Sequence, residues 1–112
     1  MTFNKTNPPD KSIIVQPYQK HIVYILKCAD GSFYVGSATD IEDRLKRHNS
    51  GNGAGFTALR RPVKLVYQEP CKNLGDAVKR ERQIKKWSRA KKEALINGEL
   101  ETLKKLSKSR DS

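Results

Sequence analysis

The pattern of hydrophobic and polar residues divides this chain into short strand-like and helix-like stretches. Stretches rich in β-branched and aromatic residues predict three strands, at residues 21–28, 32–37 and 63–69. Amphipathic stretches predict helices at 41–49, about 74–86, 89–96 and 99–108. The main part of the chain therefore has the order ββαβαα. This order predicts an α+β fold, in which helices flank a small three-stranded antiparallel sheet.

The length of 112 residues allows one compact domain with tails. Residues 1–19 mix Asn, Thr, Lys and Pro, and this composition predicts a flexible N-terminal arm. We expect the folded domain at 20–98 and a C-terminal helix with a frayed tail at 99–112. No stretch has the length and hydropathy of a signal peptide or a membrane span, so we expect a cytoplasmic protein.

Polar residues mark where the helices begin, and a glycine-rich segment follows the first of them. The candidate caps are Thr39 or Asp40, Asn73 or Asp76, and Ser88. The segment 50–61 predicts a loop. This loop has two interpretations: a mobile surface loop, or a segment that bends over a nucleic acid and stacks Phe56 on an unpaired base.

The predicted hairpin decides which residues share a face of the sheet. A three-residue turn at 29–31, with Gly31 in the left-handed conformation, pairs Leu26 with Tyr34 and Tyr24 with Gly36. Both tyrosines then lie diagonally on one face, beside the bare backbone of the glycine. A two-residue turn would instead place them on opposite faces. Strand tyrosines most often only fill a sheet, so the spacing alone favours that simpler role.

The first helix carries two polar residues where apolar ones are expected. Ile41 and Leu45 define its apolar stripe, and Arg44 and His48 fall on the same stripe, one turn apart. Their side chains can therefore converge. A structural histidine and a catalytic one are about equally compatible with this pattern.

The second helix repeats this anomaly with an acidic residue. Glu81 lies on a stripe whose other members are inward-facing by pattern: Leu74, Ala77, Val78 and Ile84. An inward carboxylate must be paired, hydrogen-bonded or bound to a metal. An ion pair with Arg44 and a metal site are both open. The many cations between Lys79 and Lys92 are expected on the solvent side of this region.

Charge narrows the choice of partners. The chain has 23 Lys and Arg against 12 Asp and Glu, a formal net charge of +11. Such an excess points to a polyanion, of which nucleic acid is the commonest. A membrane surface is a weaker candidate, because the basic helix lacks an opposing face of large apolar residues. Cys28 and Cys71 have no metal-binding spacing, so a zinc site is not expected.

The polar residues singled out so far suit phosphodiester hydrolysis. They comprise two phenols, a guanidinium, an imidazole and one carboxylate. Magnesium binds readily through one protein carboxylate, with waters and a phosphate oxygen as its other ligands. A cation and an arginine would stabilise the charge that builds on a phosphate in the transition state.

These residues, in this order, resemble the GIY-YIG nuclease superfamily. The resemblance rests on Val23-Tyr24, on Tyr34-Val35-Gly36, on Arg44 and His48 one turn apart, and on Glu81. It is strongest to the small single-domain bacterial type related to the incision domain of the excision-repair nuclease. It covers about residues 21–98.

The resemblance implies a catalytic role for each of five residues. Glu81 would hold a single Mg²⁺ or Mn²⁺ ion, and Arg44 would grip the phosphate that is cleaved. One of the two tyrosines, with Tyr24 favoured over Tyr34, would help to deprotonate the attacking water with His48 as its proton partner. Tyr34 would position that water or the hydration shell of the metal. A phenol needs help for this task, because its ordinary pKa is near 10.

Some positions depart from the family pattern. Ile22 and Val35 replace a glycine and an isoleucine of the two name-giving motifs, and both keep strand character. Ser37 stands where some relatives have a lysine, and Glu93 stands where some have an asparagine. One phosphate contact and one supporting amide are therefore absent or replaced.

Together these features predict a metal-dependent nuclease that hydrolyses phosphodiester bonds in DNA, is selective for structure, and serves repair or processing. The alternative is a DNA- or RNA-binding module with weak or no catalysis. We expect DNA rather than RNA as the partner, with a protein partner as one way of targeting. The expected nucleic-acid-binding residues are Gly36, Ser37, Asn49, Phe56, Thr57, Arg60, Arg61, Lys85, Lys86 and Arg89.

Overall fold

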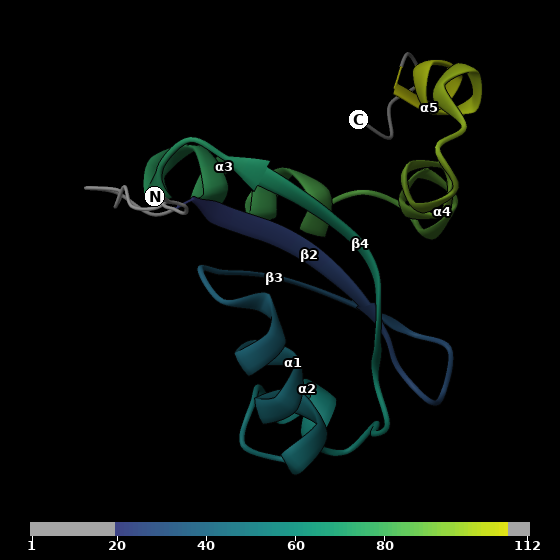
Figure 1. Ribbon diagram of the computed structural model, residues 1–112. Coiled ribbons are helices and arrows are strands. Elements are labelled where there is room, and N and C mark those ends of the chain that lie inside the picture. Colours follow the sequence, from purple (N-terminus) through teal and green to yellow (C-terminus); the bar gives the residue numbers. More distant parts are fainter. Residues whose placement is uncertain (1–19, 108–112) are drawn as a thin grey trace, which may run out of the picture.

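The computed structural model describes residues 20–107, so the predicted arm at 1–19 and the predicted frayed end at 108–112 lie outside the described residues. The strands are β2 (His21–Lys27), β3 (Phe33–Ala38) and β4 (Lys64–Cys71). The helices are α1 (Ile41–Ser50), α2 (Gly55–Ala58), α3 (Leu74–Lys85), α4 (Arg89–Asn97) and α5 (Leu100–Ser107). The strands form one antiparallel sheet in the order β3-β2-β4, with helices on both faces (Figure 1). The predicted α+β class is confirmed.

The β2–β3 hairpin has the predicted three-residue turn. The Cys28 N–H donates to the Ser32 carbonyl at 2.8 Å, and Gly31 has a φ of 88°. Glycine adopts this left-handed conformation without the steric cost of a side chain. The register pairs Leu26 with Tyr34 and Tyr24 with Gly36, so both tyrosines lie on one face, as expected.

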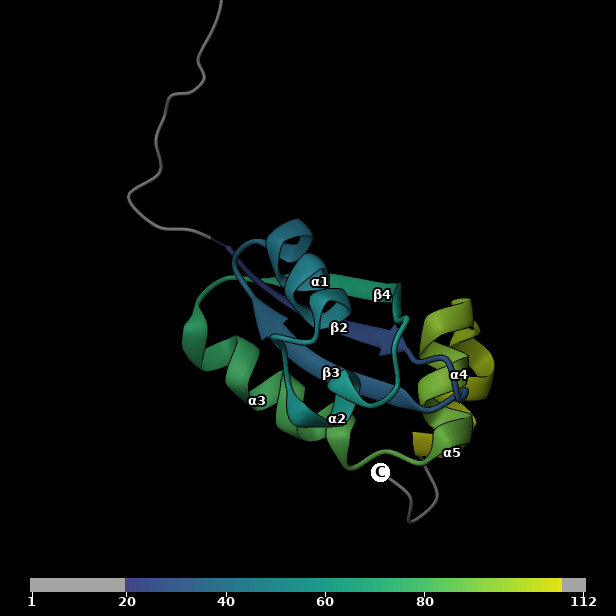
Figure 2. The ribbon, with the colours of Figure 1, turned by 90° about the horizontal axis from the view of Figure 1, so that it is seen from below.

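The two faces of the sheet are covered by different helices. Val23, Ile25 and Val35 pack with Ile84 and Trp87 on the side of α3. On the other side, where α1 and α2 lie over the sheet (Figure 2), Tyr24, Leu26 and Val63 pack with Ile41 and Leu45 of α1. Full burial of a large aliphatic side chain stabilises a fold by about 1.5–3 kcal/mol. Each layer therefore contributes to holding its helices on the sheet.

Side-chain caps fix where three helices begin. Asp40 accepts from the Asp43 N–H and begins α1, while Asn73 accepts from the Asp76 N–H and begins α3. Ser88 caps α4 as predicted, by accepting from the N–H three residues later. Such caps contribute about 1 kcal/mol each. The choice between neighbouring candidates thus falls on Asp40 and Asn73.

The prediction of a loop throughout 50–61 is wrong, because this segment contains the short helix α2. The Asn49 side chain ties the end of α1 to Val63, donating to its carbonyl at 3.0 Å and accepting from its N–H at 2.8 Å. Thr57 of α2 is buried. The glycines in this segment indicated a loop. The helical turn is stabilised by these tertiary contacts, which cannot be predicted from the local sequence.

Other expectations about α3 and α4 also need correction. Leu74, expected to face inward, is 58% exposed, because it is the first residue of α3 and lies beyond the edge of the packed stripe. Lys91, expected on the solvent side, is only 2% exposed, and its ammonium lies 4.3 Å from the centre of the Trp87 ring. A cation held over an indole gains attraction from the ring, which offsets part of its lost hydration.

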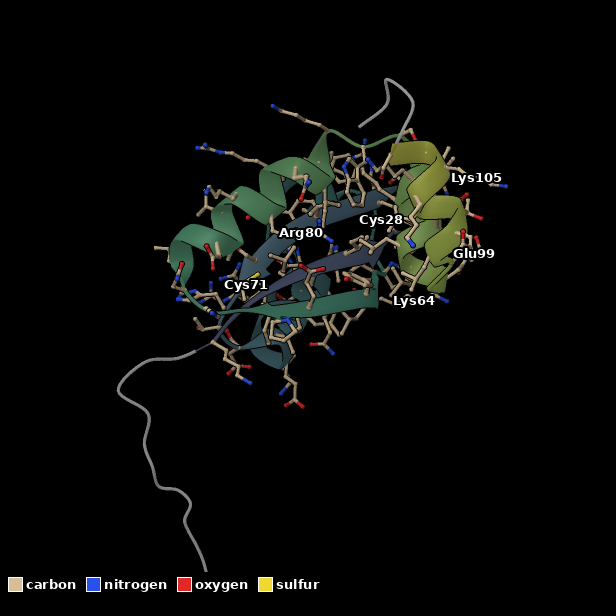
Figure 3. All side chains as sticks on the ribbon, turned by 90° about the horizontal axis from the view of Figure 1, so that it is seen from above. Cys28, Lys64, Cys71, Arg80, Glu99 and Lys105 are labelled. Atoms are coloured by element: carbon tan, nitrogen blue, oxygen red, sulfur yellow. The ribbon has the colours of Figure 1, made fainter. Side chains whose placement is uncertain are left out.

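Arg80 likewise departs from the expected solvent side. It extends from α3 toward β4, as Figure 3 shows, where its guanidinium binds the Glu69 carboxylate at 2.8 Å. The basic residues between Lys79 and Lys92 therefore fall into two groups: cations that face solvent and cations that stabilise the fold. Within residues 20–107, no helix has the length and hydropathy needed to span a membrane.

Candidate active site

Gly36 lets two tyrosines meet over the sheet. The ring centroids of Tyr24 and Tyr34 are 6.4 Å apart. A Cβ atom at position 36 would lie only 2.6 Å from the Tyr24 hydroxyl and 3.1 Å from the Tyr34 ring. Any other residue at this position would therefore displace the phenols. The predicted role of Gly36 as bare backbone beside the tyrosines agrees with this geometry.

His48 lies beneath the tyrosines as part of a chain of hydrogen bonds. Its Nε2 atom is 2.9 Å from the Tyr24 hydroxyl, and its Nδ1 atom is 2.7 Å from the Thr57 hydroxyl. The Thr57 hydroxyl in turn donates to the Ala54 carbonyl at 3.0 Å. Gly53 makes room for the imidazole, since a Cβ there would lie 2.5 Å from Nδ1. His48 is 1% exposed, so these contacts are its main polar surroundings.

This chain of hydrogen bonds assigns the tautomer of His48. A hydroxyl has a single hydrogen. Because Thr57 gives its hydrogen to the Ala54 carbonyl, it accepts from Nδ1–H of the imidazole. Nε2 of the neutral ring is then an acceptor, and the Tyr24 hydroxyl donates to it. The phenol proton therefore points at a base.

Burial shifts the pKa values of both partners toward their neutral forms. Burial raises the pKa of Tyr24 to about 12, although the hydrogen-bonding guanidinium of Arg44 acts in the opposite direction. Burial also lowers the pKa of His48, and the charge of Arg44 lowers it further. Near neutral pH the pair is thus a protonated phenol and a neutral imidazole, the state in which a proton can move from Tyr24 to His48.

Ser37 connects the cationic and the acidic parts of the site across the edge strand β3. The Arg44 guanidinium donates to the Ser37 carbonyl at 3.1 Å, and the Ser37 hydroxyl donates to Oε1 of Glu81 at 3.0 Å. Arg44 belongs to α1 and Glu81 to α3, and these two helices lie on opposite faces of the sheet (Figure 1). The sequence analysis predicted that Ser37 contacts nucleic acid. Its link to Glu81 could not be found from the chain alone, because the two residues are 44 positions apart.

Glu81 is set inward at the sheet edge rather than in bulk water. Its side chain is 22% exposed, and Oε2 forms an ion pair with the Lys85 ammonium at 2.8 Å. Glu81 thus pairs with Lys85, one turn along α3, and not with Arg44 as one interpretation of the sequence had it. A carboxylate is a ligand of the kind that Mg²⁺ binds while it keeps most of its waters. Here the two oxygens of Glu81 are bound by the Ser37 hydroxyl and the Lys85 ammonium. Among residues 20–107 there is no group of three or more acidic, histidine or cysteine side chains of the kind that encloses a metal.

The predicted nucleic-acid contacts divide into surface and structural positions. Phe56 is 39% exposed, and the Arg60 guanidinium covers its ring at 3.9 Å from the centre. Thr57 is buried beneath His48, and Asn49 spends both amide atoms on Val63, so both support the site from within.

The remaining predicted contacts carry positive charge near the surface. Arg61 is exposed and donates to the Ala58 carbonyl, and Lys86 is exposed at the end of α3. Arg89 pairs with Glu93 at 3.0 Å and lies over the Phe33 ring. Arg61 thus lies beside the ends of α1 and α2, whereas Lys85, Lys86 and Arg89 lie along the end of α3 and the start of α4.

Comparisons with known proteins show what the chain is similar to. The GIY-YIG catalytic domain family matches residues 20–94. UPF0213 protein SSP2268 of Staphylococcus saprophyticus is 55% identical over 78 residues, which are 70% of this chain and 95% of that protein. A UPF0213 protein of Staphylococcus aureus strain Mu3 is 53% identical over 76 residues, which are 68% of this chain and 93% of that protein.

A solved structure extends the likeness to the fold. The solution NMR structure of protein EF2693 from E. faecalis is 38% identical to this chain, with a TM-score of 0.52. The similarity covers 75% of this chain and 90% of that one. The family match over residues 20–94 and the relatives above half identity lead to one conclusion: this chain belongs to the GIY-YIG family, whose catalytic domain is a nuclease domain.

Proposed function

We propose that the protein is a metal-dependent nuclease that hydrolyses phosphodiester bonds in DNA, with selectivity for nucleic-acid structure and a role in repair or processing. The observation that carries the proposal is the buried hydrogen bond from Tyr24 to Nε2 of His48, formed beside Arg44. A phenol and an imidazole joined in this way form a base from two groups that are each poor bases alone.

The pair removes a proton from water without building up a phenolate. As the oxygen of a water molecule bonds to phosphorus, Tyr24 takes a proton from that water and passes its own proton to Nε2 of His48. The resulting imidazolium keeps Nδ1–H bonded to Thr57. The raised pKa of Tyr24 is then no obstacle, because the phenol never carries a full negative charge. The P–O bond to the leaving oxygen breaks, and this oxygen takes a proton from solvent.

Arg44 and Glu81 hold the charged parts of the reaction. One Arg44 nitrogen is fixed on the Ser37 carbonyl, which orients the guanidinium while leaving further N–H groups for phosphate oxygens. Glu81 is the residue that would hold Mg²⁺ or Mn²⁺. A bound divalent ion would supply positive charge to the phosphate as negative charge builds there. The basic residues around the site would bind the backbone without reading sequence.

The test is cleavage of branched, nicked, single-stranded and duplex DNA with Mg²⁺, Mn²⁺ or EDTA. Glu81→Gln keeps the size of the side chain and should abolish metal-dependent cutting. Glu101→Gln removes one carboxylate from exposed α5 and serves as the matched control, with wild-type activity expected.

Two outcomes would overturn the assignment. Equal cutting by wild type and Glu81→Gln would trace the activity to a contaminant. Tight binding of DNA or RNA with no cutting in either metal would favour the second candidate, a nucleic-acid-binding module. That candidate is supported by the ion pair of Glu81 with Lys85, which already satisfies the carboxylate.

A further inference from the structure

A hollow lies beside Tyr34 and Lys85, at the edge of the proposed active site. Its volume is about 190 Å³, and it is lined by Phe33, Tyr34, Val35, Phe56, Lys85 and Lys92. Sites for drug-sized molecules measure about 300–1,000 Å³, so this one suits a single planar ring system rather than a whole cofactor. Tyr34 and Lys85 border both this hollow and the proposed active site.

The walls of the hollow are aromatic. The rings of Tyr34 and Phe56 are 6.1 Å apart with their planes inclined by 29°, and Phe33 lines the hollow from the start of β3. Guanidinium groups support two of these rings from outside the sheet core. Arg60 lies 3.9 Å from the centre of Phe56, and Arg89 lies 4.3 Å from the centre of Phe33. The rings are therefore held in place while Phe56 remains partly open to solvent.

The charges at the rim are positive. Lys85 and Lys92 both line the hollow. Lys92 has no ion pair with an acidic side chain in the part of the chain that the structure describes, so its ammonium is free to meet an anion. Aromatic walls with ammonium groups at the rim are complementary to a nucleobase and its phosphate.

We propose that this hollow is a subsite for an unpaired nucleobase adjacent to the phosphate that is cleaved. Only an unpaired base can leave its stack and enter, because the faces of a paired base are covered by its neighbours in the duplex. The substrate class is therefore nucleic acid with an unpaired nucleotide at the cut, such as a flap, a branch or a single strand. This inference rests on the proposed nuclease function and specifies its substrate.

The test measures binding separately from cutting. Glu81→Gln protein is titrated by fluorescence anisotropy with a flap DNA and with a fully paired duplex of equal length. Adding Phe56→Ala should weaken flap binding about 5- to 100-fold, the range for loss of one base–aromatic stack, and change duplex binding less than about twofold. Leu59→Ala, on the same segment and 86% exposed, is the matched control and should leave both affinities unchanged.

Three further measurements keep the test decisive if Phe56→Ala perturbs Tyr34. Phe56→Tyr retains an aromatic ring and should restore flap binding. Lys92→Gln should lower the affinity for flap DNA and reduce its salt dependence by about one counterion. A 2-aminopurine placed beside the cleavage point should lose fluorescence on binding wild type and keep it with Phe56→Ala.

The outcomes separate this inference from the nuclease proposal. If wild type cuts DNA but Phe56→Ala weakens flap and duplex binding equally, the subsite is wrong and the nuclease stands. If wild type cuts no nucleic acid in either metal, the nuclease is wrong, and selective flap binding through Phe56 would then support the subsite as part of a binding module.

Discussion

The two faces of the sheet are built in opposite ways. On the α3 face, Val23, Ile25 and Ile84 form an apolar layer, and the polar Glu81 sits at its edge. On the α1 face, polar groups occupy the interior itself: Tyr24, His48 and Thr57 are all nearly inaccessible to solvent. Both faces contribute apolar packing, but the α1 face alone also buries the hydrogen bonds through which we propose that the proton moves.

This difference shows how a small domain can bury polar groups safely. An unpaired buried donor or acceptor costs about 1–3 kcal/mol. The polar groups on the α1 face avoid this cost because each one has a hydrogen-bond partner. Tyr24 donates to His48, His48 donates to Thr57, and Thr57 donates to the Ala54 carbonyl. Removing one member should therefore affect its neighbours, whereas a change on the α3 face should act locally.

The largest expected effect is that of Tyr24→Phe on the α1 face. This change keeps the ring but removes the hydroxyl that donates to His48, so the proton path is cut. We expect the cleavage rate to fall by about 10²–10⁴-fold, the usual contribution of a positioned acid–base group. Single-turnover kinetics on a branched substrate measure this. Tyr67→Phe, which removes a hydroxyl from β4, is the control, and an equal loss in both variants would contradict the comparison.

The next effect is on stability and belongs to the α3 face. Ile84→Ala leaves a cavity in the apolar layer and should lower the free energy of unfolding by about 2–5 kcal/mol. Ile84→Val should cost only about 0.5–1.5 kcal/mol. Urea denaturation gives both values. Activity per folded molecule should remain at the wild-type level, and a large loss of activity in the folded state would show that the two faces are not separate.

Thr57→Val sharpens the comparison from within the α1 face. Valine has the shape of threonine but cannot accept the proton on Nδ1 of His48, so the imidazole loses the partner that sets its tautomer. We expect about 1–3 kcal/mol of destabilisation and a shift toward the Nε2–H form. Thr57→Ser should restore both properties. Nitrogen chemical shifts of His48 report the tautomer, and unchanged shifts in Thr57→Val would contradict the assigned role.

The smallest effect is the pH dependence of stability due to His48. Burial holds the pKa of His48 below 6.5 in the folded protein, so below that pH the unfolded chain binds a proton that the folded chain does not. The contribution of His48 to the free energy of unfolding is therefore fully present above pH 6.5. It is lost as the pH falls from 6.5 toward the lower pKa of the folded protein. Urea unfolding gives the free energy of unfolding at each pH from about pH 8 to about pH 5. This free energy should fall less steeply with falling pH in His48→Gln than in wild type. A slope equal to that of wild type would exclude His48 as its source.

Much of the site could be predicted because it breaks local rules. Arg44, His48 and Glu81 each stand where a helical stripe calls for an apolar side chain, and the structure places all three at the sheet, as that anomaly suggested. Gly31 fixed the hairpin register and with it the shared face of the tyrosines.

What was missed depends on contacts between distant residues. The burial of Lys91 requires Trp87 beneath its ammonium, and the link from Ser37 to Glu81 joins β3 to α3. The helix α2 forms within a glycine-rich segment because Thr57 packs under His48. The hydrophobic periodicity of a helix or strand predicts which of its sides faces inward. It does not predict which residues of other elements pack against that side.

The ion pair between Lys85 and Glu81 has a consequence for how the protein can be handled. Metal sites built from several carboxylates are strained by mutual repulsion until a cation arrives. Here a lysine on the same helix neutralises Glu81, the carboxylate proposed to bind the ion, with 2.8 Å between ammonium and oxygen. We therefore expect folding not to need a metal ion: the protein should refold in a chelator and reach the same structure as protein refolded without one.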